Sequence, residues 1–255
     1  MSDNVKLIRH EAGIAEILID RPERHNAMTL SMYEDMLRLI GACSGDAGLR
    51  CILFRGAGGK SFISGTDISY FSDFTAGSQG LRYEAFVERV IDAVERIAVP
   101  TVAVIDGWAV GGGLALATAC DFRLCSAASK FGAPIAKTLS NTLSSRNIAR
   151  LAAALGVPRV KKMLLLAEYI TAQEALDCGY VYQACDPQAL TSAAFDLARR
   201  LAALSPVTQQ AAKESLRRIV AEQSLRDEDL IEHVYGSAAF RDGVASFVSG
   251  SKRQS

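Results

Sequence analysis

The order of the apolar segments limits what this chain can fold into more than any other feature of its sequence. In the first part of the chain, short apolar and β-branched segments alternate with longer ones whose apolar residues recur at helical spacing. The strand-like segments are "AEILID" (15–20), "CILFRG" (51–56) and "TVAVIDG" (101–107). The helix-like segments are "TLSMYEDMLRLIGAC" (29–43) and "YEAFVERVIDAVERI" (83–97). Strands that alternate with helices predict a layered α/β core.

After about residue 137 the pattern becomes almost entirely helical. We expect helices in "RNIARLAAALG", "PRVKKMLLLA", "TAQEALDCG", "PQALTSAAFDLARRLAAL", "PVTQQAAKESLRRIV" and "DEDLIEHVYGSAAF". One further strand, "YVYQA" (180–184), is expected among them. We therefore divide the chain into a core, 1–186, and a helical region, 187–255, that packs on the core or on neighbouring subunits.

Composition excludes several classes of protein. Of the 255 residues 49 % are hydrophobic and 22 % charged, which excludes a disordered chain, and 28 basic against 28 acidic residues argue against nucleic-acid binding. The cysteines form no CxxC pair and have no neighbouring histidine, so we expect no metal site and a reducing, cytoplasmic environment. Neither a signal peptide nor an apolar run long enough to cross a membrane is evident, so no membrane partner is expected.

Two glycine-bearing loops each follow a strand-like segment and precede a helix-like one. They are "GAGGKSFISGTDISYF" (56–71) and "DGWAVGGGLALA" (106–117). A helix N-terminus leaves backbone N–H groups without partners, and glycine lets a ligand approach them. Two such loops could aim two N–H groups at one oxygen, forming an oxyanion hole. Alternatively, the glycines serve only tight turns and close packing. Neither loop opens the βαβ unit that dinucleotide binding requires.

Three motifs in a fixed order make the chain resemble the crotonase, or enoyl-CoA hydratase/isomerase, superfamily. They are "DRPERHNAMTLSM" (20–32), "FISGTDIS" (62–69) and "GWAVGGGLALATACDFRLCS" (107–126). Further segments that look like this family are "FGAPIA" (131–136), "TAQEALDCGYVYQ" (171–183) and "FRDGVASF" (240–247). The resemblance covers nearly the whole chain.

The resemblance implies a spiral of ββα units and a C-terminal helical region, 187–255, that assembles homotrimers or hexamers. It also implies an acyl-CoA substrate, with coenzyme A as part of that substrate and no covalently bound cofactor. Carried over by position, the oxyanion-hole N–H groups belong to Ser64 and Gly112. Residues expected along the coenzyme A path are Arg24, Ser64, Gly65, Thr66, Asp67, Ile68, Gly111 and Gly112.

Some residues of these motifs have simpler interpretations. Asp67 is expected to cap the following helix rather than to take part in chemistry. Arg24 either lies near the coenzyme A phosphates or is solvated, and His25 is interpreted as a surface histidine. Asn26 is expected to fix a turn through hydrogen bonds to the backbone.

Two positions depart from the family's hydratases, which use two glutamates to activate water and deliver a proton. By position these glutamates correspond to Ala115 and Ile135 here. Neither side chain can bind a proton, so we expect water addition by the usual mechanism to fail. The family's enoyl isomerases keep the second glutamate, so Ile135 also counts against that reaction.

The hydroxyl-rich segment after Ile135, "AKTLSNTLSSRNIAR", also departs from the family pattern. It is either a rebuilt acyl pocket or a capped helix N-terminus, and we slightly favour the cap. Candidates for an acid or base are Tyr70, Tyr83, Glu84, Thr138 and Ser140. A Ser-His-Asp hydrolase is rejected, since no G-x-S-x-G motif is present.

Two functions remain open at this stage. The first is an enzyme that acts on an acyl-CoA through an enolate, with lyase, isomerase, decarboxylase and thioester hydrolase reactions all open. The second is a catalytically inactive acyl-CoA binding protein of the same fold. The hydroxyl-rich segment favours the enzyme, whereas the loss of both glutamates favours the binding protein.

Overall fold

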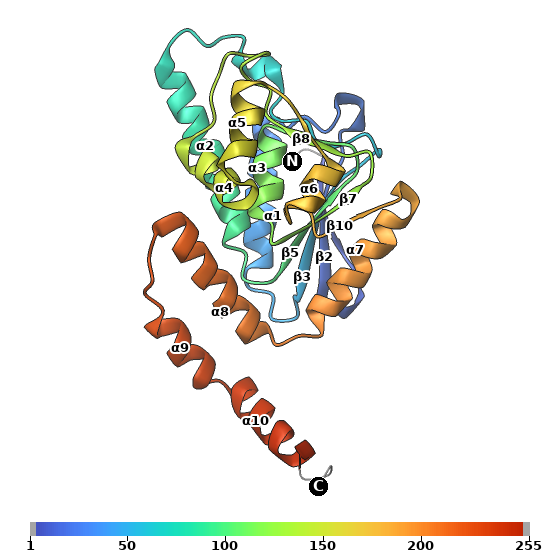
Figure 1. Ribbon diagram of the computed structural model, residues 1–255, viewed down its shortest axis with the longest axis vertical. Coiled ribbons are helices and arrows are strands. Elements are labelled where there is room, and N and C mark those ends of the chain that lie inside the picture. Colours follow the sequence, from blue (N-terminus) through green and yellow to red (C-terminus); the bar gives the residue numbers. More distant parts are fainter. Residues whose placement is uncertain (1–3, 252–255) are drawn as a thin grey trace.

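The computed structural model describes residues 4–251, in which two β-sheets are packed among helices (Figure 1). The larger sheet has the order β1-β2-β3-β5-β7-β10, with β1 (Val5–Arg9), β2 (Ile14–Ile19), β3 (Cys51–Gly56), β5 (Thr101–Ile105), β7 (Phe122–Ser126) and β10 (Gln183–Cys185). The smaller sheet has the order β4-β6-β8-β9, with β4 (Ser61–Ile63), β6 (Trp108–Val110), β8 (Lys130–Gly132) and β9 (Ile170–Thr171). The helices are α1 (Leu30–Cys43), α2 (Gly77–Glu95), α3 (Gly112–Ala119), α4 (Ser145–Leu155), α5 (Val157–Leu165), α6 (Ala172–Asp177), α7 (Pro187–Ala202), α8 (Pro206–Arg217), α9 (Glu228–Tyr235) and α10 (Ala238–Ser251).

Helices cover both faces of the larger sheet, and this explains its continuous apolar strands. Strands β2, β3, β5, β7 and β10 run parallel, and β1 pairs with β2 in the antiparallel direction. Side chains alternate between the faces, so Ile52 and Phe54 join the cluster under α1 to α3, whereas Cys51 and Leu53 face α7.

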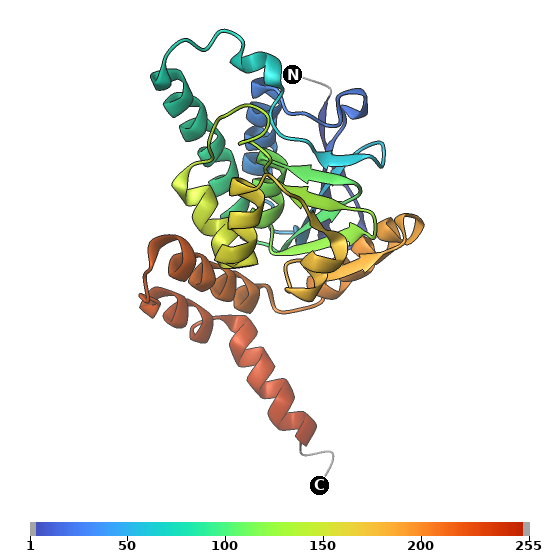
Figure 2. The same ribbon diagram turned by 45° about the horizontal axis from the view of Figure 1, so that its top comes forward.

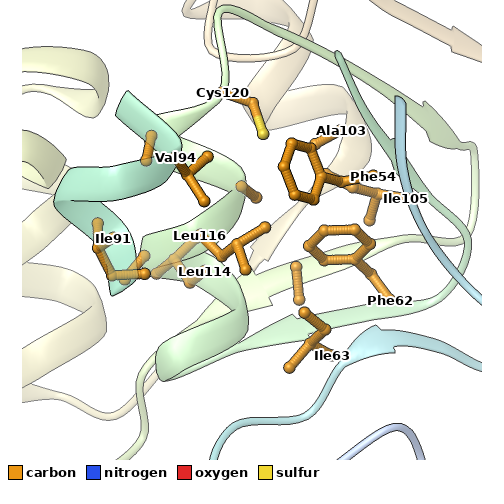
Figure 3. Close-up of a cluster of buried hydrophobic side chains, with 14 of the residues drawn as sticks. Phe54, Phe62, Ile63, Ile91, Val94, Ala103, Ile105, Leu114, Leu116 and Cys120 are labelled. Atoms are coloured by element: carbon orange, nitrogen blue, oxygen red, sulfur yellow. The ribbon is translucent and has the colours of Figure 1, made fainter. Parts of the chain in front are cut away.

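Helix α3 lies inside the core rather than on its surface. Figure 3 shows Leu114 and Leu116 of α3 between Ile91 of α2 and Phe54 of the larger sheet. Six of its eight residues are buried, which requires a helix that is apolar on all sides. Because β6 leads directly into α3, this packing fixes where the helix N-terminus lies.

The C-terminal helices differ in how much of the core they contact. Helix α7 packs on the larger sheet through Leu190, Leu197 and Leu201, all buried. By contrast, α10 extends away from the body of the molecule in both views, and α9, which contacts α8, connects it to the rest of the chain (Figures 1 and 2). Large apolar side chains remain exposed along α8 to α10 and the segments between them, and Leu225 is 82 % exposed.

Most elements that the sequence predicts are present, with two shifts. The helix predicted over 83–97 begins earlier, at Gly77, where the Gln79 side chain accepts hydrogen bonds from the amides of Thr75 and Ala76. The strand predicted over 180–184 is shorter and later, at 183–185. Tyr180 lies before the strand in a bend, and its side chain is buried, with its hydroxyl hydrogen bonded to Thr118 at 2.9 Å.

Candidate active site

The two glycine-bearing loops line one cavity of about 380 Å³. Ser64 directly follows β4, and Gly112 is the first residue of α3. The other walls are the N-terminal half of α2 and the segment 134–143. The lining residues are His25, Ser61, Ser64, Gly65, Thr66, Ile68, Phe71, Tyr83, Glu84, Trp108, Val110, Gly111, Gly112, Pro134, Ile135, Thr138, Leu139, Asn141, Leu143 and Tyr169.

The backbone N–H groups of Ser64 and Gly112, one from each loop, have no acceptor among the described residues. The amide of Gly111 donates to the carbonyl of Gly132 at 3.0 Å and is therefore occupied. The amide of Gly112, at the first helical position, has no such partner, and neither does the amide of Ser64. The partial positive charge of a helix N-terminus adds to the attraction that Gly112 exerts on an anionic oxygen.

Each of the three consecutive glycines has a structural reason of its own. Gly111 has a φ of +54°, which favours glycine. A Cβ at Gly112 would lie 2.7 Å from the Tyr33 hydroxyl, and one at Gly113 would collide with the carbonyl oxygen of Ile63. The interpretation as turn and packing residues is therefore right for this loop. The space beside Gly112 is filled by a side chain of α1, while its N–H remains unpaired.

A chain of hydroxyl groups runs beside this helix N-terminus. Tyr33 hydrogen bonds with Thr66 at 3.1 Å, and Thr66 hydrogen bonds with Tyr83 at 2.6 Å. Burial raises the pKa of Tyr33 to about 12 and also raises the pKa of Tyr83. Both phenols are therefore neutral at ordinary pH and serve as hydrogen-bond partners rather than as bases.

Glu84 is the only carboxylate among the described lining residues. The backbone N–H of Ser144 donates to its Oε2 at 2.8 Å. Burial raises the pKa of Glu84, the Ser144 N–H opposes this rise, and the negative charge of Glu88 adds to it. Glu88 itself accepts from the Ser144 hydroxyl at 2.8 Å and is paired with Arg150, so it ties α2 to α4.

The predicted cap at Asp67 is confirmed. Its carboxylate accepts from the amide of Ser69 at 3.1 Å at the start of a 3₁₀ turn, Ile68–Phe71, and does not line the cavity. Arg21, which the sequence analysis does not single out, donates to the same carboxylate at 2.7 Å. The hydrogen bond from Arg21 is the main reason that the pKa of Asp67 falls to about 2.

The acid and base candidates separate into two groups. Tyr83, Glu84 and Thr138 line the cavity. Tyr70 does not, because it packs against neighbouring aromatic rings. Ser140 does not line it either; this residue has a left-handed backbone with a φ of +55°, and its amide donates to the Ile135 carbonyl.

The segment after Ile135 contains the expected helix cap. Ser144 accepts from the amide of Asn147 at 3.2 Å, and α4 begins at the next residue. The same segment also walls the cavity, with Ile135, Thr138 and Asn141 among the lining residues. Both interpretations of this segment therefore describe part of it.

The remaining motif residues lie in and around the cavity. Ala115 is buried in the core and does not line the cavity. Arg24 is exposed outside it, next to His25, an exposed residue that does line it. Asn26 is fully buried, and its side chain accepts from the amide of Arg21 and donates to the carbonyls of residues 57 and 61, thereby joining two loops.

The sequence analysis missed two features of the cavity: the hydrogen bond between Tyr33 and Thr66, and the pair of aromatic rings, Trp108 and Tyr169, in its wall. Tyr33 occupies one of the apolar positions of α1, and nothing in that pattern indicates that its hydroxyl reaches Thr66. Trp108 and Tyr169, whose ring centroids are 4.9 Å apart, come from distant parts of the chain and have no common sequence signal.

Neither a metal site nor a membrane-spanning helix is found in the part of the chain that the structure describes. No group of histidine, cysteine or acidic side chains within residues 4–251 could hold a metal ion. Within the same residues no helix has the length and the apolar character needed to cross a membrane.

Solved structures share this arrangement of sheets, helices and C-terminal region over almost the full chain. An enoyl-CoA hydratase/carnithine racemase from Magnetospirillum magneticum superposes with a TM-score of 0.89 at 28 % identity, covering 98 % of this chain and 94 % of its own. An enoyl-CoA hydratase from Bacillus anthracis superposes with a TM-score of 0.87 at 25 % identity, covering 97 % of both chains. The fold is therefore α/β and crotonase-like, as predicted.

The sequence comparison gives the family. The profile described as Enoyl-CoA hydratase/isomerase matches residues 9–254, and the chain belongs to this family. A short-chain-enoyl-CoA hydratase from Clostridium acetobutylicum is 29 % identical over 86 % of this chain and 83 % of its own. An (E)-benzylidenesuccinyl-CoA hydratase from Thauera aromatica is 32 % identical over 79 % of this chain and 78 % of its own.

Proposed function

We propose that this protein binds an acyl-CoA thioester and holds its carbonyl oxygen between the N–H groups of Ser64 and Gly112. The observation that carries the proposal is that these two unpaired amides line the same cavity. Two donors aimed at one oxygen stabilise the negative charge that develops when the thioester forms an enolate. Coenzyme A enters as part of the substrate, and the proposal needs no bound cofactor.

The rest of the coenzyme A would follow the loop that contains Ser64. Gly65, Thr66 and Ile68 line the cavity next to Ser64, and Ile68 is 59 % exposed. Arg24 lies one residue from the cavity-lining His25, and in this proposal it would contact a phosphate that leaves the cavity on that side. Asp67 would support this loop through Arg21 rather than contact the ligand.

The proposed reaction is not the addition of water by a pair of glutamates. At the two positions where the family's hydratases have them, this chain has Ala115 and Ile135. Neither side chain orients water or carries a proton. The hydratases named among the relatives therefore support the thioester substrate more than they support this particular reaction.

The alternative function is an acyl-CoA binding protein without catalysis. The loss of two carboxylates favours it, whereas Glu84 in the cavity wall favours an enzyme, since a carboxylate is a group that can move a proton. We favour the enzyme for this reason.

We further propose that the chain assembles as a homotrimer or a hexamer through the helical region 187–255. The exposed apolar side chains of α8 to α10, among them Leu216, Ile231 and Tyr235, support this assembly. The six cysteines, all free thiols, support the proposal that the protein works in the cytoplasm.

The experiment that tests the binding site compares acyl-CoAs with free coenzyme A. Calorimetry with acetyl-, butyryl-, benzoyl- and succinyl-CoA should show tighter binding than coenzyme A alone, because only a thioester offers the carbonyl oxygen. Equal affinity for all of them would show that the two amides do not hold a thioester. The same panel, assayed for turnover, separates an enzyme from a binding protein.

A further inference from the structure

The cavity has one titratable group that the proposed oxyanion hole leaves without a role, the carboxylate of Glu84 on α2. Oε2 accepts the Ser144 N–H at 2.8 Å. Oε1 has no hydrogen-bond partner within the described residues. It is not buried, so it remains accessible to a proton donor. One oxygen is thus held by the backbone, while the other is free to accept a proton.

Other polar groups of the cavity wall are less suited to act as the base. The Tyr83 hydroxyl is engaged with Thr66, and burial raises the pKa of Tyr83. The Thr138 hydroxyl donates to the carbonyl of Pro134 at 3.1 Å. His25 is exposed, and no hydrogen bond to a described residue orients its ring, whereas the Glu84 carboxylate is held by the Ser144 amide. By elimination, Glu84 is the group suited to remove a proton inside the cavity.

The position of Glu84 is fixed by its surroundings. Ser144, whose amide holds Oε2, caps α4 with its own hydroxyl and also bonds Glu88. Phe71, Leu143 and Ile135 add apolar surface to the same cavity. A carboxylate held in a partly apolar wall is a stronger base than one in water.

We infer that Glu84 is the catalytic base that removes and returns a carbon-bound proton next to the thioester carbonyl. This inference rests on the proposed function. The Cα–H bond breaks as an O–H bond forms on Oε1, and the electron pair moves into the C–C bond as the carbonyl oxygen becomes the enolate oxygen. Return of the proton to the same carbon regenerates the substrate. Return to a more distant carbon of an unsaturated acyl group shifts its double bond, so the reaction class is proton transfer.

The test is exchange of the α-protons of butyryl-CoA in D₂O, followed by mass spectrometry, because this assay needs no knowledge of the natural acyl group. Glu84→Gln keeps an oxygen for the Ser144 N–H but cannot accept the proton. We expect exchange to fall by about 10²-fold or more, as general base catalysis predicts, while the Kd for butyryl-CoA changes less than about threefold. Glu34→Gln, on the exposed part of α1, is the control for loss of one carboxylate elsewhere.

The pH dependence provides a second readout on the unmodified protein. The groups that interact electrostatically with Glu84 are Glu88, Tyr33 and Tyr83, and both phenols are neutral through this range. Exchange should therefore rise with pH through a single pKa above the ordinary value of 4.5 for a glutamate. Glu84→Gln should abolish this rise if the residual exchange is measurable.

The outcomes separate this inference from the proposed function. Exchange that persists in Glu84→Gln overturns the role of Glu84 and leaves the thioester site standing. Butyryl-CoA that binds to the unmodified protein without any exchange between pH 4 and 9 also overturns it. Failure of butyryl-CoA and the other thioesters to bind more tightly than coenzyme A overturns the proposed function itself. If Glu84→Gln does not fold, the pH profile of the unmodified protein decides, and a rate without a rise above pH 4.5 contradicts the inference.

Discussion

Removing the N–H of Gly112 without disturbing its surroundings is the most direct test of the proposed oxyanion hole. Gly112 is the first residue of α3, a position that tolerates proline because its N–H has no intrahelical acceptor. A Cβ at this position would lie 2.7 Å from the Tyr33 hydroxyl but 3.9 Å from the ring carbon that carries it. Tyr33→Phe therefore makes room, and Gly112→Pro in that background replaces the N–H by a ring carbon.

The expected loss follows from one hydrogen bond. A neutral N–H···O bond contributes about 0.5–1.5 kcal/mol, which is about a 2- to 10-fold change in Kd. Because the ring carbon also occupies the position of the amide hydrogen, the thioester oxygen cannot approach, and we expect a loss of at least about 10-fold. In turnover or proton exchange the loss should reach about 10²- to 10³-fold, because the bond strengthens as negative charge develops.

Two controls isolate the N–H. Tyr33→Phe alone reports the lost hydrogen bond to Thr66, and Tyr33→Phe with Gly112→Ala adds the Cβ while keeping the N–H. Both should bind butyryl-CoA in calorimetry within about threefold of the unmodified protein. If the proline variant is folded by circular dichroism and binds butyryl-CoA as tightly as the alanine variant, the Gly112 amide does not hold the thioester.

Three further predictions concern the reaction, the assembly and the loop that carries Ser64. Crotonyl-CoA hydration should be far below the ~10 s⁻¹ of an ordinary enzyme, because Ala115 and Ile135 provide no carboxylate. An ordinary rate in a spectrophotometric assay would show that another acid has taken over. Light scattering at micromolar concentration should give the mass of a trimer or a multiple of it, and a monomeric mass would contradict assembly through the exposed apolar helices. Asp67→Ala should lower the free energy of unfolding by about 1 kcal/mol, as loss of a cap does. Since the pKa of Asp67 is lowered from 3.8 to about 2, its contribution is fully present above pH 4 and is lost as the pH falls through 2. Urea unfolding at several pH values measures the difference in free energy of unfolding between the unmodified protein and Asp67→Ala. This explanation is refuted if that difference does not become smaller at low pH.

The sequence by itself determined the local structure and the backbone of the site. Thr29 and Ser144 mark helix starts, because a side-chain oxygen followed by an apolar periodic segment satisfies the amides of a first helical turn. The segment 51–56 forms the strand that its β-branched and apolar residues predict, Cys51–Gly56. The glycine loops could be located because their conformational needs, such as the positive φ of Gly65 and Gly111, leave a direct trace in the sequence.

Only the tertiary structure decided which side chains surround the backbone amides of Ser64 and Gly112. Tyr33, Tyr83 and Glu84 lie on α1 and α2, whose sequences show an apolar face but not which polar side chains reach the cavity. They meet Thr66 and Ser144 because α2 and α4 pack beside α3, which contributes Gly112, and α1 packs beside α2. Tyr70 and Ser140 were equally good candidates by residue type, but neither lines the cavity: Tyr70 packs against aromatic rings, and Ser140 has a left-handed backbone. The position of a side chain in a cavity depends on the relative placement of elements distant in sequence, and that placement is set by packing of the whole core.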